Sequence, residues 1–119
     1  MPKIFESEYR FCEIVWETEP VRSRELVELA KERLGWKPTT TYTVIKRLAE
    51  RGVLVNENTV VRSLVGRDDA RVSEIDELVE KKFAGSVPAF IAAFASSRRL
   101  SDEDADELQK MIDEMRKRS

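Results

Sequence analysis

The sequence predicts a mainly α-helical fold with a small β-hairpin, in which a winged helix-turn-helix over residues 1–66 is followed by a helical region over residues 67–119. Three observations predict this order. Residues 8–51 contain three successive segments with apolar residues at helical spacing. Residues 53–65 then change to a β-rich pattern, and helical spacing returns after them.

The first helix is expected from about Glu8 to Glu17, with Ser7 as its N-cap. Its apolar residues cover more than one face, which predicts that the helix is deeply packed. They include Cys12, the single cysteine of the chain, so an intramolecular disulfide is impossible. Because Cys12 falls within the apolar pattern, we interpret it as a buried structural thiol and not as a redox sensor.

The second helix follows a break at Thr18-Glu19-Pro20 and a short strand that is expected at Val21. This helix is predicted from about Arg24 to Leu34, with Ser23 as its cap. Its leucine, valine and alanine residues recur at helical spacing and are expected to face the core. Gly35 ends it.

The third helix, predicted from about Pro38 to Arg51, has an uneven distribution of side chains. Pro38 presets the φ of a first turn, and Gly52 stands where a left-handed cap is needed. One face is apolar, whereas the other carries hydroxyls, a phenol and cations with no carboxylate before Glu50. A helix that approaches phosphates and base edges requires such a face. Its residues are Thr39, Thr40, Tyr42, Thr43, Lys46 and Arg47.

The net charge of −2 is unevenly distributed along the chain. Residues 1–66 hold 11 Lys/Arg and 10 Asp/Glu, whereas residues 67–119 hold 10 and 13. Within residues 33–51 there are five cations, and Glu50 is the single carboxylate. A local basic patch on an acidic protein fits binding in a nucleic-acid groove. An ordinary solvated face is the alternative explanation of the same charges.

The hairpin is expected from two β-rich runs, residues 53–55 and 59–65, with a tight turn at Asn56-Glu57-Asn58. Two helices joined by a brief connection and followed by a hairpin are the order of a winged helix-turn-helix. Residues 1–66 are therefore interpreted as a DNA-binding domain.

Three further helices are predicted, at about Asp68 to Ala84, at about Val87 to Ser96 with Ser86 as cap, and from the capping pattern at residues 101–104 onward. A core of roughly 50 residues is weak on its own. We therefore expect this region to pair with a second copy, because a two-fold dimer buries one patch twice. The alternative is that it packs back onto the winged helix of its own chain. The predicted dimerisation residues are Leu78, Val79, Phe83, Phe90, Ile91, Phe94, Leu108, Met111, Ile112 and Met115.

The composition argues against an enzyme and against a metal or cofactor site. Histidine, the commonest general base and metal ligand, is missing, and one cysteine cannot build an ordinary zinc site. The sequence contains none of the motifs G-x-S-x-G, P-loop or G-x-G-x-x-G. No apolar run approaches 18 residues, and residues 1–8 lack the apolar middle of a signal peptide, which predicts a cytoplasmic protein without membrane contact.

Several segments match a known pattern: residues 8–16 with Trp16, residues 21–29, the run from Trp36 through Pro38 to Leu48, residues 50–54, the Phe83-Ala84-Gly85-Ser86 hinge and Leu100-Ser101. In these segments the sequence resembles the penicillinase repressor family of bacterial regulators. The match spans nearly the whole chain. The resemblance implies a homodimeric repressor that binds a palindromic double-stranded DNA operator, with the third helix in the major groove and the last helices setting the spacing of the half-sites.

On that reading, each polar residue of the third helix has an expected role. Thr39, Thr40, Tyr42, Thr43 and Lys46 face DNA, and Lys37 and Arg47 lie near phosphates. Lys46 serves a guanine edge or a phosphate, hydroxyls donate to phosphates, and threonine methyls meet thymine methyls. Arg62, the cation of the wing, completes the predicted DNA-binding set.

The sequence departs from the family pattern at three places. The wing turn at residues 56–59 is short and lacks the family's basic Gly-Arg pair. Ala93-Phe94 stands where members that are inactivated by proteolysis have Asn-Phe, which argues against cleavage by a sensor peptidase. The clustered C-terminal cysteines of copper-responsive members are missing. The short acidic wing and negative net charge favour the second interpretation, a winged-helix module that binds protein instead of DNA.

Overall fold

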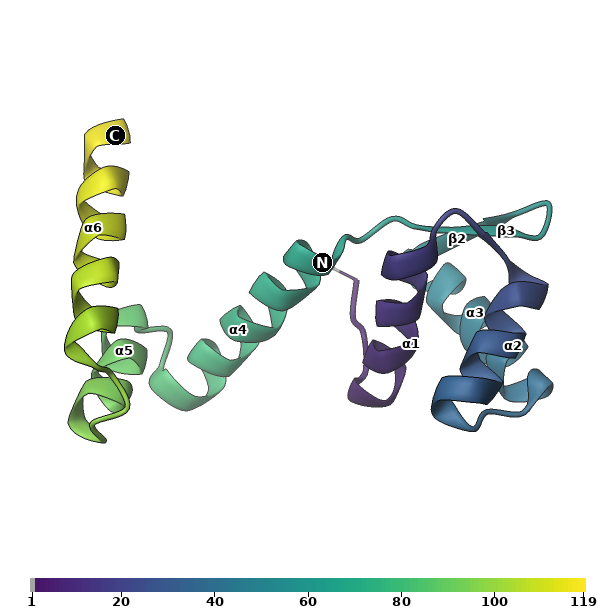
Figure 1. Cartoon of the computed structure of the whole chain (residues 1–119), viewed down its shortest axis with the longest axis horizontal. Coiled ribbons are helices and arrows are strands. Elements are labelled where there is room, and N and C mark those ends of the chain that lie inside the picture. The colour runs from purple at the N-terminus through teal and green to yellow at the C-terminus, as the bar shows by residue number, and fades with distance from the viewer. Residues whose placement is uncertain (1) are drawn as a thin grey trace. The chain divides into compact units, whose positions relative to one another are not determined.

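The computed structural model describes residues 2–119, which form two compact units (Figure 1). The first unit ends at Glu74 and the second runs from Ile75 to Ser119, so that the division falls within one helix. The described residues form six helices and three strands. In chain order these are α1 Glu6–Thr18, β1 Val21–Arg22, α2 Ser23–Leu34, α3 Pro38–Glu50, β2 Leu54–Glu57, β3 Val60–Ser63, α4 Arg67–Phe83, α5 Val87–Ser96 and α6 Asp102–Arg118. The mainly α-helical fold class with a winged helix at its start is confirmed.

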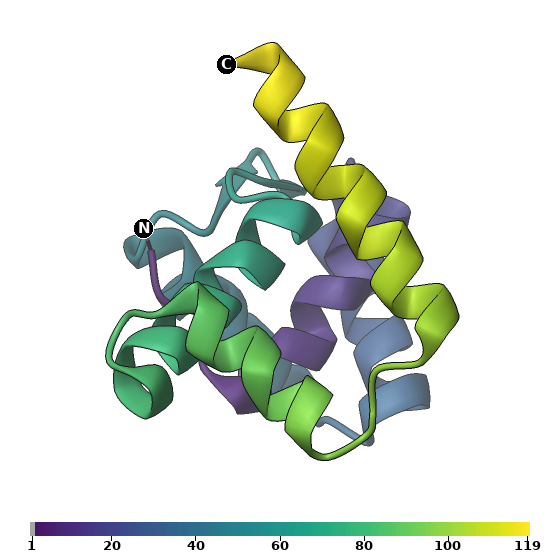
Figure 2. The same cartoon turned by 90° about the vertical axis from the view of Figure 1, so that its left-hand side faces the viewer.

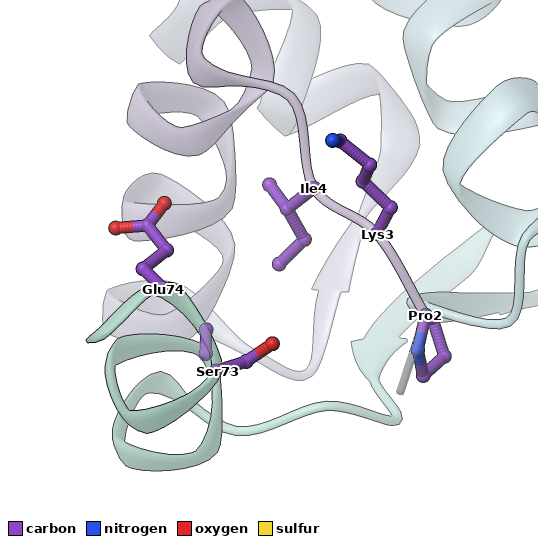
Figure 3. A pocket seen from close by; sticks show the side chains of 6 residues that line it. Pro2, Lys3, Ile4, Ser73 and Glu74 are labelled. Carbon is purple, nitrogen blue, oxygen red and sulfur yellow. The ribbon is translucent and has the colours of Figure 1, made fainter. Parts of the chain in front are cut away.

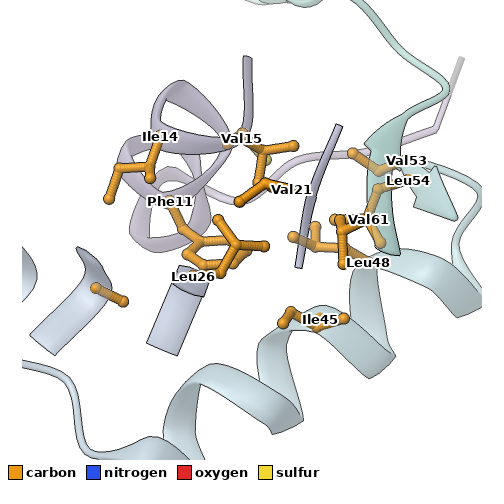
Figure 4. Close-up of a cluster of buried hydrophobic side chains, with 12 residues drawn as sticks. Phe11, Ile14, Val15, Val21, Leu26, Ile45, Leu48, Val53, Leu54 and Val61 are labelled. Carbon is orange, nitrogen blue, oxygen red and sulfur yellow. The ribbon is translucent and has the colours of Figure 1, made fainter. Parts of the chain in front are cut away.

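The first unit has one apolar core, enclosed by α1, α2, α3 and the sheet (Figure 4). Its largest fully buried side chains include Phe11, Leu26 and Leu48, one from each helix. Burying each such side chain contributes roughly 1.5–3 kcal/mol. The Phe11 ring also stacks on Trp36, with 5.4 Å between ring centroids. This packing fixes the rotation of α3 and so determines which of its faces is exposed.

The first turns of α1 and α2 differ from the predicted ones. The N-cap of α1 is Phe5 and not Ser7, and the Phe5 amide donates to Glu8 Oε1 at 2.9 Å. Since a glutamate at the third helical position can satisfy the cap amide, no hydroxyl is needed there. In α2, Ser23 is the first helical residue instead of the cap, and its amide donates to the Thr59 carbonyl at 2.8 Å.

The three-stranded sheet has the order β1-β3-β2 and is antiparallel throughout. The short strand expected at Val21 is present, and Val21 pairs with Val61 of β3. The hairpin turn is not at residues 56–58 but at Asn58 and Thr59, with φ of 51° and 67°. Positive φ at both turn residues matches the twist of the flanking strands, so β2 continues for two residues beyond its predicted end.

The helices of the second unit follow the predicted caps. Ser86 Oγ accepts from the Ala89 amide at 3.1 Å at the start of α5, and Ser101 Oγ accepts from the Asp104 amide at 3.0 Å at the start of α6. Figure 2 shows the connecting segment that leads from the end of α5 into α6, which ends near the C-terminus. The Phe90 ring makes edge contacts with two other phenylalanines, at centroid distances of 5.5 and 5.3 Å. Within residues 2–119, no helix combines the length and the apolar character that a membrane span needs.

Cys12 is a buried thiol, as predicted, with 2% of its surface exposed. Burial, and after it the neighbouring Glu8 carboxylate, raise the pKa of Cys12 to about 12 against the opposing effect of Arg51. A thiol with this pKa carries almost no thiolate at neutral pH, and the thiolate is the reactive form.

We therefore expect native protein to resist a thiol-specific reagent such as DTNB at pH 8, and protein unfolded in guanidinium chloride to react with one equivalent. Because the unfolded thiol titrates near pH 8.5, this group also lowers the free energy of unfolding as the pH rises from about 8.5 toward 12. Rapid labelling of the native protein at one equivalent would contradict the buried assignment.

Candidate nucleic-acid interface

The exposed face of α3 carries the polar side chains that the sequence predicts there. Its opposite face is buried at Thr41, Ile45 and Leu48, which have 0%, 3% and 0% of their surface exposed. Tyr42 is 49% exposed, and Thr41 is the one threonine of this helix that points into the core. All eight residues predicted to contact DNA are exposed: Lys37, Thr39, Thr40, Tyr42, Thr43, Lys46, Arg47 and Arg62.

The five cations of residues 33–51 fall into two groups. Arg33 pairs with Glu17 at 2.7 Å, and this hydrogen bond lowers the pKa of the Glu17 carboxyl. Arg51 pairs with the Glu8 carboxylate. Within residues 2–119, Lys37, Lys46 and Arg47 make no ion pair with a carboxylate. Of these five cations, the three without an ion pair therefore lie at the N-cap of α3 and along its exposed face.

A hollow of about 410 Å³ lies between α3 and β2. Tyr42 and Lys46 of the helix line it together with Asn56 of the strand, so a phenol, an ammonium and an amide meet at one place. Ile45 and Ala49 add apolar surface, and Glu50 adds the carboxylate. This combination of donors and apolar groups suits the edges and backbone of a nucleic acid better than an apolar ligand.

The cation predicted in the wing, Arg62, forms an ion pair in the structure. Arg62 Nη2 lies 3.2 Å from Glu57 Oε1, and both side chains are exposed. The turn at Asn58 and Thr59 makes this pair possible, since it keeps Glu57 within β2 on the same face as Arg62. The Glu57–Arg62 pair therefore adds no net charge to the hairpin of β2 and β3.

Arg22 is a residue that sequence reasoning missed. It is exposed on β1 opposite Val60, and its Nη1 donates to Thr59 Oγ1 at 3.3 Å, beside the wing turn. The short strand expected at Val21 could have indicated this position, because a strand that pairs with the hairpin also places the next residue, Arg22, beside it. The structure thus brings a second cation to the wing tip from a distant part of the chain.

Comparisons with known proteins place the whole chain in a family. The family model of the penicillinase repressor matches residues 4–114. The chain belongs to the penicillinase repressor family. It is 23% identical to the penicillinase repressor of Bacillus licheniformis, over 99% of this chain and 95% of that protein. It is also 28% identical to an uncharacterized 16.5 kDa protein in the ptsI 3′ region of Latilactobacillus sakei, over 92% of this chain and 78% of that protein.

Penicillinase repressor family membership assigns this chain the role of a transcriptional repressor. The family is one of regulators and not of enzymes. Within residues 2–119, no group of three or more acidic, cysteine or histidine side chains could hold a metal ion. The hollow between the N-terminal segment and the start of α4, lined by Ile4, Ser73 and Glu74 among others, has only about 20 Å³ and suits a single water (Figure 3).

The second unit of this penicillinase repressor family member exposes five of the ten residues predicted at a dimer interface and half-buries four others. Met111 and Met115 are each 62% exposed, and Ile112 is 43% exposed. Val79 is different, because it is 5% exposed in the single chain and has little surface to offer a partner. A groove of about 340 Å³ is lined by Leu78, Phe83, Phe90, Ala93, Phe94, Ser97 and Arg99. Ile75 and Val87, which were not predicted, are 49% and 58% exposed.

Proposed function

We propose that this chain is a homodimeric repressor whose α3 helix binds the major groove of a palindromic DNA operator. One observation carries the proposal: α3 buries its apolar face and presents Lys37, Lys46 and Arg47 without carboxylate partners among the described residues. Cations without carboxylate partners on an exposed helix face are what neutralises phosphates, and the hydroxyls between them suit base edges.

The contacts divide by chemistry. Lys37 and Arg47 flank the exposed face and serve phosphates, whereas Tyr42 and Lys46 line the hollow beside β2 and reach base edges or sugar. Arg22 adds a phosphate contact at the wing tip, and Arg62 adds less because Glu57 neutralises it. The same face appears twice in a two-fold dimer, which matches a palindromic site.

Replacing Tyr42 and Lys46 together with alanine is expected to weaken operator binding by about 10- to 100-fold, because one base-edge contact and one cation are lost. Because each half-site loses one cation, the slope of log affinity against log salt should fall by about two. The measurement is fluorescence anisotropy with the duplex upstream of the protein's own gene, at two salt concentrations and with competitor DNA present.

The matched control is Lys110→Ala, which removes one exposed cation from α6 in the second unit. This variant should bind the duplex as the unmodified protein does, and sedimentation should give all three proteins the same oligomeric state. Unchanged binding by the Tyr42→Ala, Lys46→Ala variant would remove the recognition role of α3.

The Glu57–Arg62 ion pair favours one other function, a winged-helix module that binds protein. A wing without net charge from this pair suits a protein surface as well as a phosphate backbone. The two functions differ in salt dependence, since phosphate contacts release counterions. Saturable DNA binding with a steep salt slope excludes the protein-binding module as the main function, and its absence favours that module.

A further inference from the structure

Thr43 lies at the middle of the exposed face of α3. With 100° between successive residues of a helix, Thr43 is almost diametrically opposite the buried side of Thr41 and Leu48. It is exposed and belongs to the first two turns of a helix that begins at Pro38. In helix-turn-helix proteins, the N-terminal residues of the recognition helix contact base edges.

The hydroxyl of Thr43 is already used within the helix. Its Oγ1 donates to the carbonyl oxygen of Thr39 at 2.8 Å, one turn earlier. This bond selects one of the two side-chain rotamers that a helical threonine adopts. It consumes the single proton that the hydroxyl could donate to DNA, so the exposed side chain offers its methyl group and, on the oxygen, acceptor lone pairs only.

Thr39 and Thr40 are different in this respect. Both are exposed, and within residues 2–119 neither hydroxyl makes a hydrogen bond. Their protons can be donated to phosphate or base oxygens. Three exposed threonines of similar sequence context therefore present different chemical groups, and the one at the centre of the face presents an apolar group.

The major groove contains one apolar group on its base edges, the C5 methyl of thymine, and threonine methyls are among the side-chain groups that contact it. We propose that Thr43 is a specificity-determining residue that recognises thymine by contact between the two methyl groups. The inference rests on the proposed DNA binding by α3, and it assigns the Thr43 hydroxyl a role within the helix instead of at the base.

The test first enriches a duplex from a randomised pool with the unmodified protein. Affinities are then measured for the unmodified protein, Thr43→Val and Thr43→Ser. Each is tested on that duplex and on copies in which one thymidine at a time is replaced by deoxyuridine, which lacks the methyl. Thr43→Val keeps the shape and the methyl, whereas Thr43→Ser keeps only the hydroxyl. Thymidines outside the contact serve as internal controls, and thermal unfolding checks that both variants fold.

We expect Thr43→Val to bind within about two-fold of the unmodified protein. Thr43→Ser should bind about four-fold more weakly for each half-site, the value of one buried methyl group, and so about 15-fold more weakly on a duplex with both half-sites. A single deoxyuridine at the contacted position of either half-site should weaken the unmodified protein about four-fold and should weaken Thr43→Ser no further, since the contact is already lost. Such non-additivity identifies a direct pair.

Weak binding by Thr43→Val with full binding by Thr43→Ser would show that the hydroxyl reads the base, which overturns the inference. The inference would also be overturned if deoxyuridine lowered the affinity of the unmodified protein equally at every thymidine position, or at none of them. These outcomes all require that the unmodified protein enriches a duplex. If it enriches none, the proposed DNA binding itself fails, and the inference falls with it.

Discussion

Replacing Arg51 with methionine is expected to destabilise the first unit by about 3 kcal/mol, because it leaves the Glu8 carboxylate buried without its cation. Glu8 is 6% exposed and pairs with Arg51 Nη2, while Arg51 Nη1 donates to the Lys3 carbonyl at 3.0 Å. The guanidinium also lies 4.7 Å from the centroid of the Phe5 ring. Arg51 thus joins the N-terminal segment and α1 to the end of α3.

The measurement is urea unfolding of the full chain, and two variants make it specific. Arg33→Met breaks the Arg33–Glu17 pair, whose side chains are 46% and 47% exposed, and should cost less than about 1 kcal/mol. Glu8→Gln combined with Arg51→Met should recover part of the loss, because the stranded charge is gone. If Arg51→Met and Arg33→Met lower the free energy of unfolding equally, the buried Glu8–Arg51 pair stabilises the protein no more than the exposed Arg33–Glu17 pair does.

These two ion pairs show where sequence reasoning ends. The helices were predicted from the local periodicity of their apolar residues. Helix α5, for example, begins and ends at the predicted residues. Glu8 and Arg51 are separated by 43 positions, and no local pattern relates them. Only the folded core brings the start of α1 to the end of α3, so neither residue was predicted to have a partner.

The wing turn illustrates a different difficulty. Asparagine occurs at both 56 and 58, and either can occupy a turn. The prediction placed the turn two residues too early, and this shift concealed the pairing of Glu57 with Arg62 across the hairpin. The amphipathic face of α3 was predicted correctly because its apolar and polar residues separate by helical period alone. An ion pair between two strands can be predicted only when the register of the strands is known, and the sequence did not determine that register.

Replacing Met111 with aspartate is expected to dissociate the proposed dimer while leaving each chain folded. Met111 is 62% exposed in the single chain, so a carboxylate there remains hydrated in a monomer. At a dimer interface the same carboxylate is buried without a partner, at a cost of several kcal/mol. Sedimentation at micromolar concentration should show a dimer for the unmodified protein and a monomer for the variant, with unchanged circular dichroism.

The control is Lys110→Asp, which introduces the same carboxylate on the side of α6 away from the apolar stripe of Leu108, Met111, Ile112 and Met115. It should remain dimeric. A dimeric Met111→Asp variant would place the interface elsewhere, and a monomeric unmodified protein would contradict the dimer itself.

The DNA affinity of Met111→Asp then separates dimerisation from recognition. A dimer holds its second α3 helix near the second half-site, and this effective concentration can raise affinity by about 10²- to 10⁴-fold. We therefore expect the variant to lose about that factor on a duplex with both half-sites. On a duplex with a single half-site, it should bind as well as the unmodified protein, because its α3 face is intact. If Met111→Asp binds both duplexes more weakly than the unmodified protein, the substitution damages the first unit. If the two proteins bind the duplex with both half-sites equally well, one α3 helix is sufficient for binding.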